Sequence, residues 1–129
     1  MKILVVDDAQ TVRGYHRQIL EEAGFSVGEA ANGLEAVEKV FQEPGQYAAL
    51  LVDINMPQMD GYSLVREVRS NPDAQAIPAI MISTEAEMHD RDLAYQAGAN
   101  GYLVKPVKPD VLIRQLNLIT GRFEEAEHG

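Results

Sequence analysis

The residues best suited to chemistry in this sequence are aspartates that directly follow apolar runs. Asp7 and Asp8 come after the run Lys2–Val6, and Asp53 comes after the run Ala48–Val52. Three carboxylates that meet in one place cannot all stay ionised unless a cation lies between them. The chain has no cysteine and no histidine beside these aspartates. Hard oxygen ligands therefore predict Mg²⁺ or a similar ion that keeps several of its waters.

Polar side chains also follow two later apolar runs. Ser83 and Thr84 come after Pro78–Ile82, and Lys105 comes after Gly101–Val104. A carboxylate, a Mg²⁺ ion, a lysine and a hydroxyl group together supply a nucleophile, two sources of positive charge and a hydrogen-bond donor. This combination is suited to binding and transferring a phosphoryl group.

Five apolar runs alternate with five helical patterns, and this alternation would position the polar groups. The runs are Lys2–Val6, Phe25–Ala30, Ala48–Val52, Pro78–Ile82 and Gly101–Val104. The pattern predicts right-handed crossovers and a parallel sheet covered on both faces. The second and fifth runs carry more polar residues and are expected at the edges. This favours a doubly wound, flavodoxin-like (βα)5 α/β fold with strand order 2-1-3-4-5, in which the strand ends near the switch in order share one pocket.

Composition limits the classes of function. The 129 residues carry 20 acidic and 11 basic side chains, a formal net charge of −9. Such a chain repels nucleic-acid phosphates, so direct nucleic-acid binding is not expected. No signal peptide or membrane-length apolar stretch is present, and the lack of cysteine suits the cytoplasm. We expect one domain over residues 1–121 and an acidic, frayed tail over residues 122–129.

Four motifs together resemble the receiver domain of two-component response regulators, the CheY-like family. They are the Asp7–Asp8 pair, "VDINMPQMDGY", Ser83 and "GYLVKP". They occur in the expected order, and the resemblance extends over residues 2–121. It implies that Asp53 accepts a phosphoryl group from the phosphohistidine of a sensor kinase, and that Lys105 pairs with the phosphoryl oxygens.

The resemblance also implies a metal site and a position for the lysine. Asp8, Asp53 and the backbone carbonyl of Asn55 would bind Mg²⁺, and Asp7 would act largely through metal-bound water. The bond between Lys105 and its following proline is expected to be cis, as in similar proteins.

A switch and a lifetime for the signal follow from the same resemblance. Ser83 would turn toward the new phosphoryl group, and Tyr102 would then swing inward as the aromatic switch residue. Asn55 and Glu85, two residues beyond the acceptor and the hydroxyl residue, would flank the water that hydrolyses the acyl phosphate. Their types resemble chemotaxis-type regulators and predict a short-lived phosphorylated state.

The implied protein is a single-domain phosphoacceptor switch rather than an enzyme. A sensor histidine kinase or a histidine phosphotransfer protein would supply the phosphoryl group. A downstream protein would bind the face of the fourth helix, fifth strand and fifth helix, with the chain a monomer or a weak, phosphorylation-dependent dimer. The alternatives are a phosphorelay shuttle and a receiver that belongs to a longer regulator or hybrid kinase.

Plainer interpretations of single residues remain open at this point. Asp8 could cap the first helix, and Ser83 or Thr84 could cap the fourth. Tyr102 could be an ordinary packing residue. Two enzyme or cofactor classes fit poorly. A haloacid-dehalogenase-type phosphatase needs an aspartate where Asn55 stands, and the loop "DDAQT" would repel the phosphate of a flavin nucleotide.

Overall fold

The computed structural model describes residues 1–84 and 88–121. Its strands are β1 (Lys2–Val6), β2 (Ser26–Ala30), β3 (Tyr47–Asp53), β4 (Ala79–Ser83) and β5 (Gly101–Val104). Its helices are α1 (Gln10–Glu22), α2 (Gly33–Gln42), the 3₁₀ turn η1 (Pro44–Gln46), α3 (Gly61–Ser70), α4 (Met88–Ala97) and α5 (Pro109–Thr120). The predictions for Glu85 and for the tail 122–129 fall outside the described residues.

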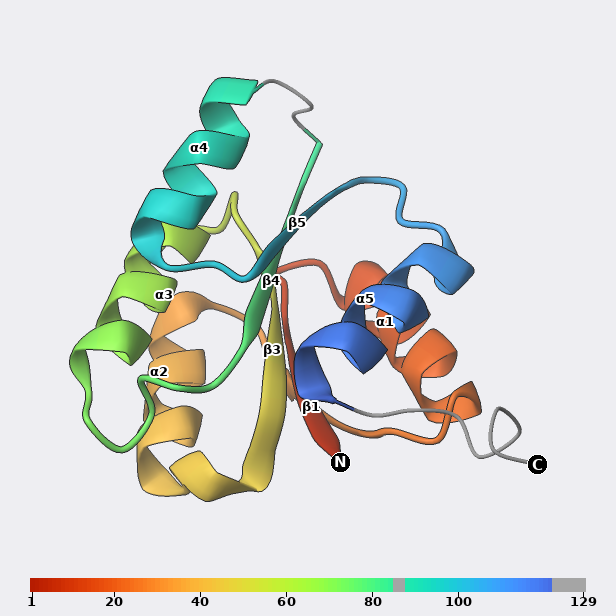
Figure 1. The fold of residues 1–129 in the computed structure, drawn as a ribbon, viewed down its shortest axis with the longest axis horizontal. Coiled ribbons are helices and arrows are strands. Elements are labelled where there is room, and N and C mark those ends of the chain that lie inside the picture. Colours follow the sequence, from red (N-terminus) through yellow and green to blue (C-terminus); the bar gives the residue numbers. More distant parts are fainter. Residues whose placement is uncertain (85–87, 122–129) are drawn as a thin grey trace.

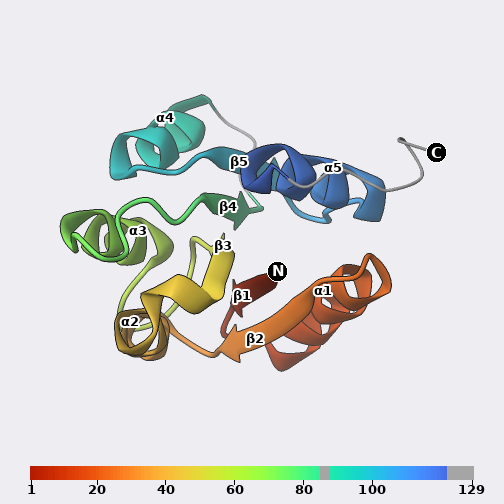
Figure 2. The ribbon, with the colours of Figure 1, turned by 60° about the horizontal axis from the view of Figure 1, so that its bottom comes forward.

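The strands form one parallel sheet in the order β2-β1-β3-β4-β5, which confirms the predicted fold (Figure 1 and Figure 2). Two strands end one residue later than predicted. Asp53 and Ser83 are the last residues of β3 and β4, not the first residues after them. Asp53 still pairs with Ile82 across the sheet, and Ser83 pairs with Val104. Strand pairing therefore positions the backbone of both residues.

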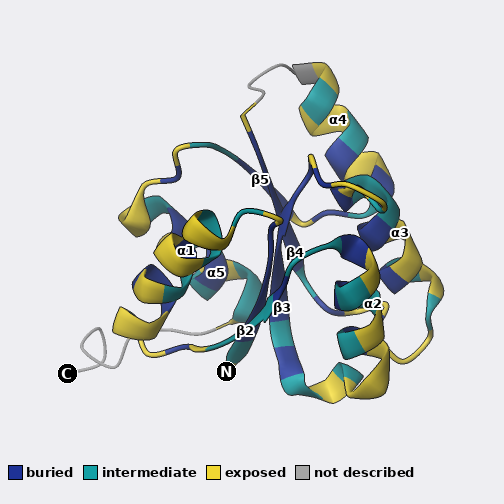
Figure 3. Cartoon of the chain, turned by 180° about the vertical axis from the view of Figure 1, so that it is seen from behind, coloured by how far each residue is buried: buried dark blue, intermediate teal, exposed yellow. Residues whose placement is uncertain are grey.

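Helices cover both faces of the sheet, with α1 and α5 on one side and α2, α3 and α4 on the other (Figure 2). Side chains alternate along each strand, so each face has its own core. Leu50 and Val52 pack toward the α2–α3–α4 layer, whereas Leu51 packs toward α1 and α5. The central strands are buried along almost their whole length (Figure 3). A sheet held this firmly is a rigid platform for the groups at its ends.

Local chemistry explains where several helices begin or end. The side chains of Asn32 and Asp60 accept hydrogen bonds from backbone N–H groups three residues on, and so cap α2 and α3. Gly24, after α1, has a φ of 95°. Such a conformation favours glycine and ends the helix. Among the described residues, no helix is long and apolar enough to cross a membrane.

The Asp8 capping alternative is wrong. The N-cap position of α1 is Ala9, and no side chain caps this helix end. The carboxylate of Asp8 is therefore not used for capping and stays available at the exposed end of the sheet.

Candidate functional site

Three carboxylates meet at the carboxyl end of the sheet, as the sequence predicts. Asp7, Asp8 and Asp53 each place one carboxylate oxygen within 4.8 Å of the others. The register of the strands explains this, because Val6 pairs with Val52 and the residues that follow them lie side by side. Asp7 and Asp53 are only 2% and 5% exposed, while Asp8 is exposed to solvent.

Among the described residues, Lys105 is the positively charged group of this cluster. Its Nζ lies 3.2 Å from Asp7 Oδ2 and 3.2 Å from Asp53 Oδ1. One ammonium group faces three carboxylates, so negative charge remains in excess. Burial and then the neighbouring Asp7 carboxylate raise the pKa of Asp53, and Lys105 only partly opposes them. Burial alone would lower the pKa of Lys105, but the carboxylates of Asp53 and Asp7 outweigh it and the net pKa is raised.

The loop after β3 packs against the backbone of Asp53 and Ile54. The Ile54 N–H donates to the carbonyl of Ile82 at 3.0 Å, and the Gly61 N–H donates to the carbonyl of Ile54 at 2.9 Å. A Cβ at Gly61 would lie 2.7 Å from the Asp53 carbonyl oxygen, so α3 can begin this close to the acceptor only with glycine. Gln58 has a φ of 70°, which turns the loop back toward α3.

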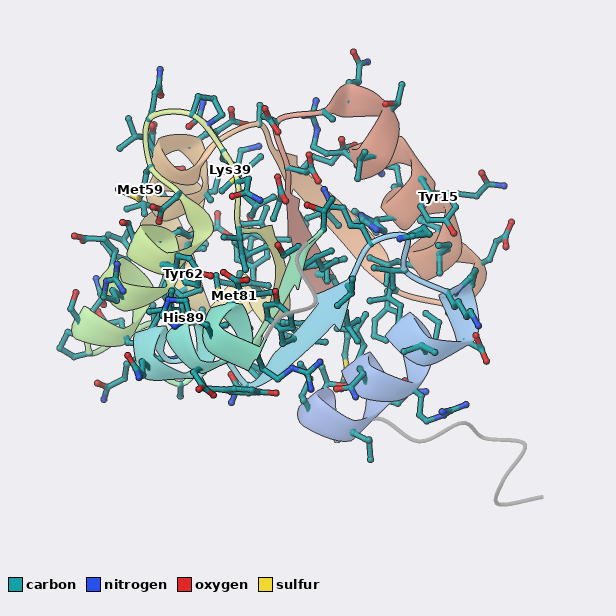
Figure 4. All side chains as sticks on the ribbon, turned by 90° about the horizontal axis from the view of Figure 1, so that it is seen from above. Tyr15, Lys39, Met59, Tyr62, Met81 and His89 are labelled. Carbon is teal, nitrogen blue, oxygen red and sulfur yellow. The ribbon has the colours of Figure 1, made fainter. Side chains whose placement is uncertain are left out.

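The same loop also touches α2. A Cβ at Gly33 would lie 2.6 Å from the carbonyl oxygen of Met59 and 2.7 Å from its Cβ, so the backbone of Gly33 packs directly against Met59. Figure 4, which looks onto the carboxyl end of the sheet, shows Met59 on this loop beside α2. The loop is therefore supported from two helices, and Asp53 has a fixed backbone.

Asp7 is oriented by contacts that the sequence alone did not indicate. Its Oδ1 accepts a hydrogen bond from the Ala9 N–H at 2.9 Å, which leaves Oδ2 for Lys105. Its backbone carbonyl accepts from Arg13 Nη1 at 2.7 Å, and Arg13 Nε pairs with Glu29 at 2.9 Å. Arg13 thus ties the end of β1 to β2. The only sequence signal for it was an arginine in the first turn of a helix.

Ser83 and Lys105 lie on neighbouring strand ends and are joined through the backbone. The Lys105 N–H donates to the Ser83 carbonyl at 2.7 Å. Ser83 is 1% exposed, which agrees with a site residue at the end of a buried strand. The bond between Lys105 and Pro106 is cis, as predicted. Thr84, next to Ser83, is exposed.

The structure describes two of the three remaining predicted residues. Tyr102 is 7% exposed and belongs to the core cluster on the α2–α3–α4 side. Asn55 is exposed in the loop after Asp53. Glu85 lies outside the described residues, so its predicted role stays a prediction.

A hollow of about 370 Å³ lies beside the cluster, between α1 and the segment after β5. Its lining includes Lys105, Pro106, Tyr15 and His16. His16 is 3% exposed, and burial lowers its pKa although Asp7 acts in the opposite sense. A neutral imidazole there adds no positive charge to the carboxylate cluster, which leaves the charge excess in place.

The residues at this site fit a hard divalent cation. The donor set consists of carboxylate oxygens, and the described part of the chain contains no thiolate or imidazole in the cluster. Oxygen donors of this kind suit Mg²⁺, which binds through one or two carboxylates and keeps several waters. The excess negative charge beside Lys105 is the electrostatic reason for a cation to bind.

Comparisons with known proteins agree with this geometry. A family model for the response regulator receiver domain matches residues 3–117. The chemotaxis protein CheY1 of Helicobacter pylori is 42% identical over 122 residues, which span 94% of this chain and 98% of that protein. Fold and site together thus define a receiver of the CheY-like class. The chain belongs to the response regulator receiver domain family of two-component signalling.

Solved structures give the same result. Chemotaxis protein CheY4 of Vibrio cholerae is 33% identical and superimposes with a TM-score of 0.85, covering 92% of this chain and 97% of that one. The receiver domain of the sensor histidine kinase PA1611 of Pseudomonas aeruginosa is 34% identical with a TM-score of 0.85, covering 93% and 97%. That structure has a magnesium ion coordinated in its active site cleft.

Proposed function

We propose that this protein is a phosphorylation-activated response regulator of the chemotaxis type, with Asp53 as the phosphoacceptor. The observation that carries the proposal is the position of Asp53, buried at a strand end between two further carboxylates, with Lys105 Nζ 3.2 Å away. The 42% identity to a chemotaxis protein of Helicobacter pylori supports the chemotaxis type. The phosphodonor would be a sensor histidine kinase or a histidine phosphotransfer protein.

The transfer is a displacement at phosphorus. A carboxylate oxygen of Asp53 forms the new P–O bond while the P–N bond to the donor imidazole breaks, and the electron pair leaves with the imidazole. Asp8, Asp53 and the backbone carbonyl of Asn55 would hold Mg²⁺, with Asp7 acting through metal-bound water. Mg²⁺, when bound, would neutralise charge on the carboxylates and the phosphoryl oxygens. Lys105, already placed beside Asp53, would bind the transferred group.

The output would be a change in partner binding. Ser83 would turn toward the phosphoryl group, and Tyr102 would act as the switch on β5. A downstream protein would bind the face formed by α4, β5 and α5, where Tyr95 is 47% and Leu118 is 66% exposed. The proposal includes a phosphoacceptor switch in the cytoplasm that is a monomer or a weak, phosphorylation-dependent dimer, rather than an enzyme with an external substrate.

The phosphorylated state would be short-lived. Asn55, exposed two residues after the acceptor, and Glu85 would flank the hydrolytic water. Loss of the phosphoryl group within minutes after removal of the donor, followed by intact mass, is the expected result. A phosphorylated form that persists for many hours contradicts this part of the proposal.

Intact-mass measurement tests the proposal. The protein is incubated with phosphoramidate, with and without Mg²⁺, as wild type, Asp53→Asn and the matched control Asp60→Asn. Asp60 caps α3 seven positions away, and asparagine preserves that cap. We expect one added phosphoryl group in wild type and Asp60→Asn, dependent on Mg²⁺, and none in Asp53→Asn. Equal labelling of Asp53→Asn overturns the assignment of the acceptor.

A second function is favoured by one comparison. The similar receiver from Pseudomonas aeruginosa is part of a sensor histidine kinase. This chain could correspondingly act as a phosphorelay shuttle or as the receiver of a longer regulator or hybrid kinase. Mixing the phosphorylated protein with a histidine phosphotransfer protein separates the two functions. Transfer of the phosphoryl group onward to histidine supports the shuttle, whereas hydrolysis alone supports the terminal regulator.

A further inference from the structure

The first part of α4 touches two tyrosines on neighbouring elements. The guanidinium carbon of Arg91 lies 5.5 Å from the centre of the Tyr102 ring. The hydroxyl of Tyr62, on α3, donates to the carbonyl of Asp90 at 3.3 Å. Figure 4 shows Tyr62 close to α4. Consecutive residues of α4 thus reach α3 and β5 at the same level of the sheet.

The two partners of the ring contact differ in exposure. Arg91 is exposed, whereas Tyr102 is 7% exposed and packs within the core cluster. A guanidinium within about 6 Å of a ring centre is attracted to the ring face. Among residues 1–84 and 88–121, Arg91 takes part in no ion pair. Within the described part of the chain, the group that attracts the positive charge of Arg91 is therefore the Tyr102 ring.

We propose that Arg91 is a positioning residue that holds the Tyr102 ring in its buried position through this cation–π contact. The proposal rests on the proposed function, in which Tyr102 is the switch. Arg91 then biases the switch toward its buried position before any phosphoryl group arrives. The residue is assigned by its contact in this chain alone.

The opposite end of α4 is held by other contacts, so the effect of replacing Arg91 is confined to the first part of the helix. There Arg69 Nε donates to the carbonyl of Gly98 at 2.9 Å, and Arg69 Nη2 donates to Asn100 Oδ1 at 2.9 Å. These bonds hold the end of α4 to α3 and to the start of β5. Loss of Arg91 therefore changes the environment of Tyr102 without detaching the helix.

Two consequences follow for phosphorylation. Coupling between two sites is reciprocal, so whatever favours the buried ring also favours the phosphorylated state if the two are linked. A cation–π contact at an exposed site changes an equilibrium by about two- to fivefold. Arg91 would thus tune the switch and not control it outright.

Hydroxyl-radical footprinting of the unphosphorylated protein tests the contact directly. The oxidation rate of each tyrosine ring is measured by peptide mass in wild type, Arg91→Gln, Arg91→Lys and the control Arg114→Gln. Tyr47, 7% exposed, and Tyr15, 46% exposed, are internal references. We expect oxidation of Tyr102 to rise about two- to fivefold in Arg91→Gln, with both references unchanged.

The conservative variant distinguishes a positioning role from general loosening. Arg91→Lys keeps a cation above the ring and should leave the Tyr102 rate within about twofold of wild type. An unchanged Tyr102 rate in Arg91→Gln overturns the proposal. So does an equal rise in Arg114→Gln, or a parallel rise at Tyr47.

A phosphorylation assay separates this proposal from the proposed function. With phosphoramidate and Mg²⁺, the ratio of phosphorylated to unphosphorylated protein at steady state should be about two- to fivefold lower in Arg91→Gln than in wild type. If wild type is not phosphorylated at all, the proposed function fails while the footprinting result still decides whether Arg91 holds the ring. An unchanged steady-state ratio in Arg91→Gln beside a more exposed Tyr102 overturns the link to the switch.

Discussion

Arg69 and Lys105 are both partly buried cations, and their surroundings are opposite. Arg69 donates to the carbonyls of Gly98, Gln75 and Ile77 and to Asn100 Oδ1. These acceptors are neutral, and burial lowers the pKa of Arg69. Lys105 instead faces the carboxylates of Asp7 and Asp53, and its pKa is raised.

The difference separates a structural cluster from a functional one. The acceptors around Arg69 are uncharged and already accept its hydrogen bonds. No excess of negative charge is left there to attract a cation. The Lys105 cluster retains an excess of carboxylate, which additional positive charge would relieve. The first cluster should contribute to stability, and the second should contribute to binding and phosphoryl transfer while costing stability.

The largest expected effect is on the Arg69 cluster. Replacement of Arg69 by alanine removes four hydrogen bonds and leaves backbone carbonyls without their donor, so the free energy of unfolding should fall by about 3 kcal/mol. Urea unfolding measures the loss, and the rate of the phosphoramidate reaction should stay close to that of wild type.

A matched control comes from Arg114, an exposed arginine whose pair with Asp110 is 3.9 Å long. Arg114→Ala should change the free energy of unfolding by less than about 0.5 kcal/mol. If Arg69→Ala costs no more than this control, the structural role assigned to Arg69 is wrong.

The next effect concerns a glycine beside the acceptor. In Gly61→Ala the new Cβ would meet the Asp53 carbonyl oxygen at 2.7 Å and the Ile54 Cα at 2.8 Å. Backbone atoms must shift, so we expect a loss of about 2 kcal/mol in the free energy of unfolding. The displaced acceptor should also react with phosphoramidate about tenfold more slowly or worse.

Gly14→Ala is the control for that substitution, because a Cβ there meets nothing within 4 Å. Alanine in this exposed helical position should stabilise the protein by about 0.5 to 1 kcal/mol and leave phosphorylation unchanged. A normal phosphorylation rate in Gly61→Ala would show that the tight packing behind Asp53 does not position it.

The contrast between the clusters also shows what sequence reasoning reaches. Alternating runs and their polar ends predicted the sheet order, the meeting of Asp7 with Asp53, and the position of Lys105, because parallel strands bring their carboxyl ends together. The alternative of an Asp8 cap was wrong, since the N-cap position of the first helix is Ala9 and no side chain caps it. Arg69 was missed entirely.

Arg69 was missed for a physical reason. An arginine in the last turn of a helix is usually a solvated residue, and its acceptors come from segments up to 31 positions away in the chain. Backbone carbonyls have no sequence identity, so no motif marks them. The Arg91 contact with Tyr102 is hidden in the same way, because it depends on how α4 lies against β5.

The expected stability change at Asp53 is smaller than those at Arg69 and Gly61, and it has the opposite sign. Burial and Asp7 raise the pKa of Asp53 above its unfolded value, so the ionised carboxylate destabilises the fold at pH values above that raised pKa. In Mg²⁺-free buffer at pH 7, Asp53→Asn should therefore raise the free energy of unfolding by on the order of 1 kcal/mol.

The pH dependence of the stability difference between Asp53→Asn and wild type tests the sign of this effect. As pH falls from the raised pKa of the folded state to the pKa of the unfolded state, the folded protein binds the proton more strongly than the unfolded chain, and the cost of the carboxylate disappears over that range. The advantage of Asp53→Asn should shrink over the same range. Destabilisation by Asp53→Asn at pH 7 would mean that the pair with Lys105 outweighs burial, contrary to this account.

The most direct test of the central claim is the effect of Mg²⁺ on stability. Unfolding is measured across a Mg²⁺ titration for wild type, Asp53→Asn and Arg69→Ala. At a Mg²⁺ concentration ten times the dissociation constant, wild type and Arg69→Ala should each gain about 1.4 kcal/mol, and Asp53→Asn clearly less. No gain in wild type, or an equal gain in all three proteins, would contradict the assignment of the strand-end carboxylates as a cation site.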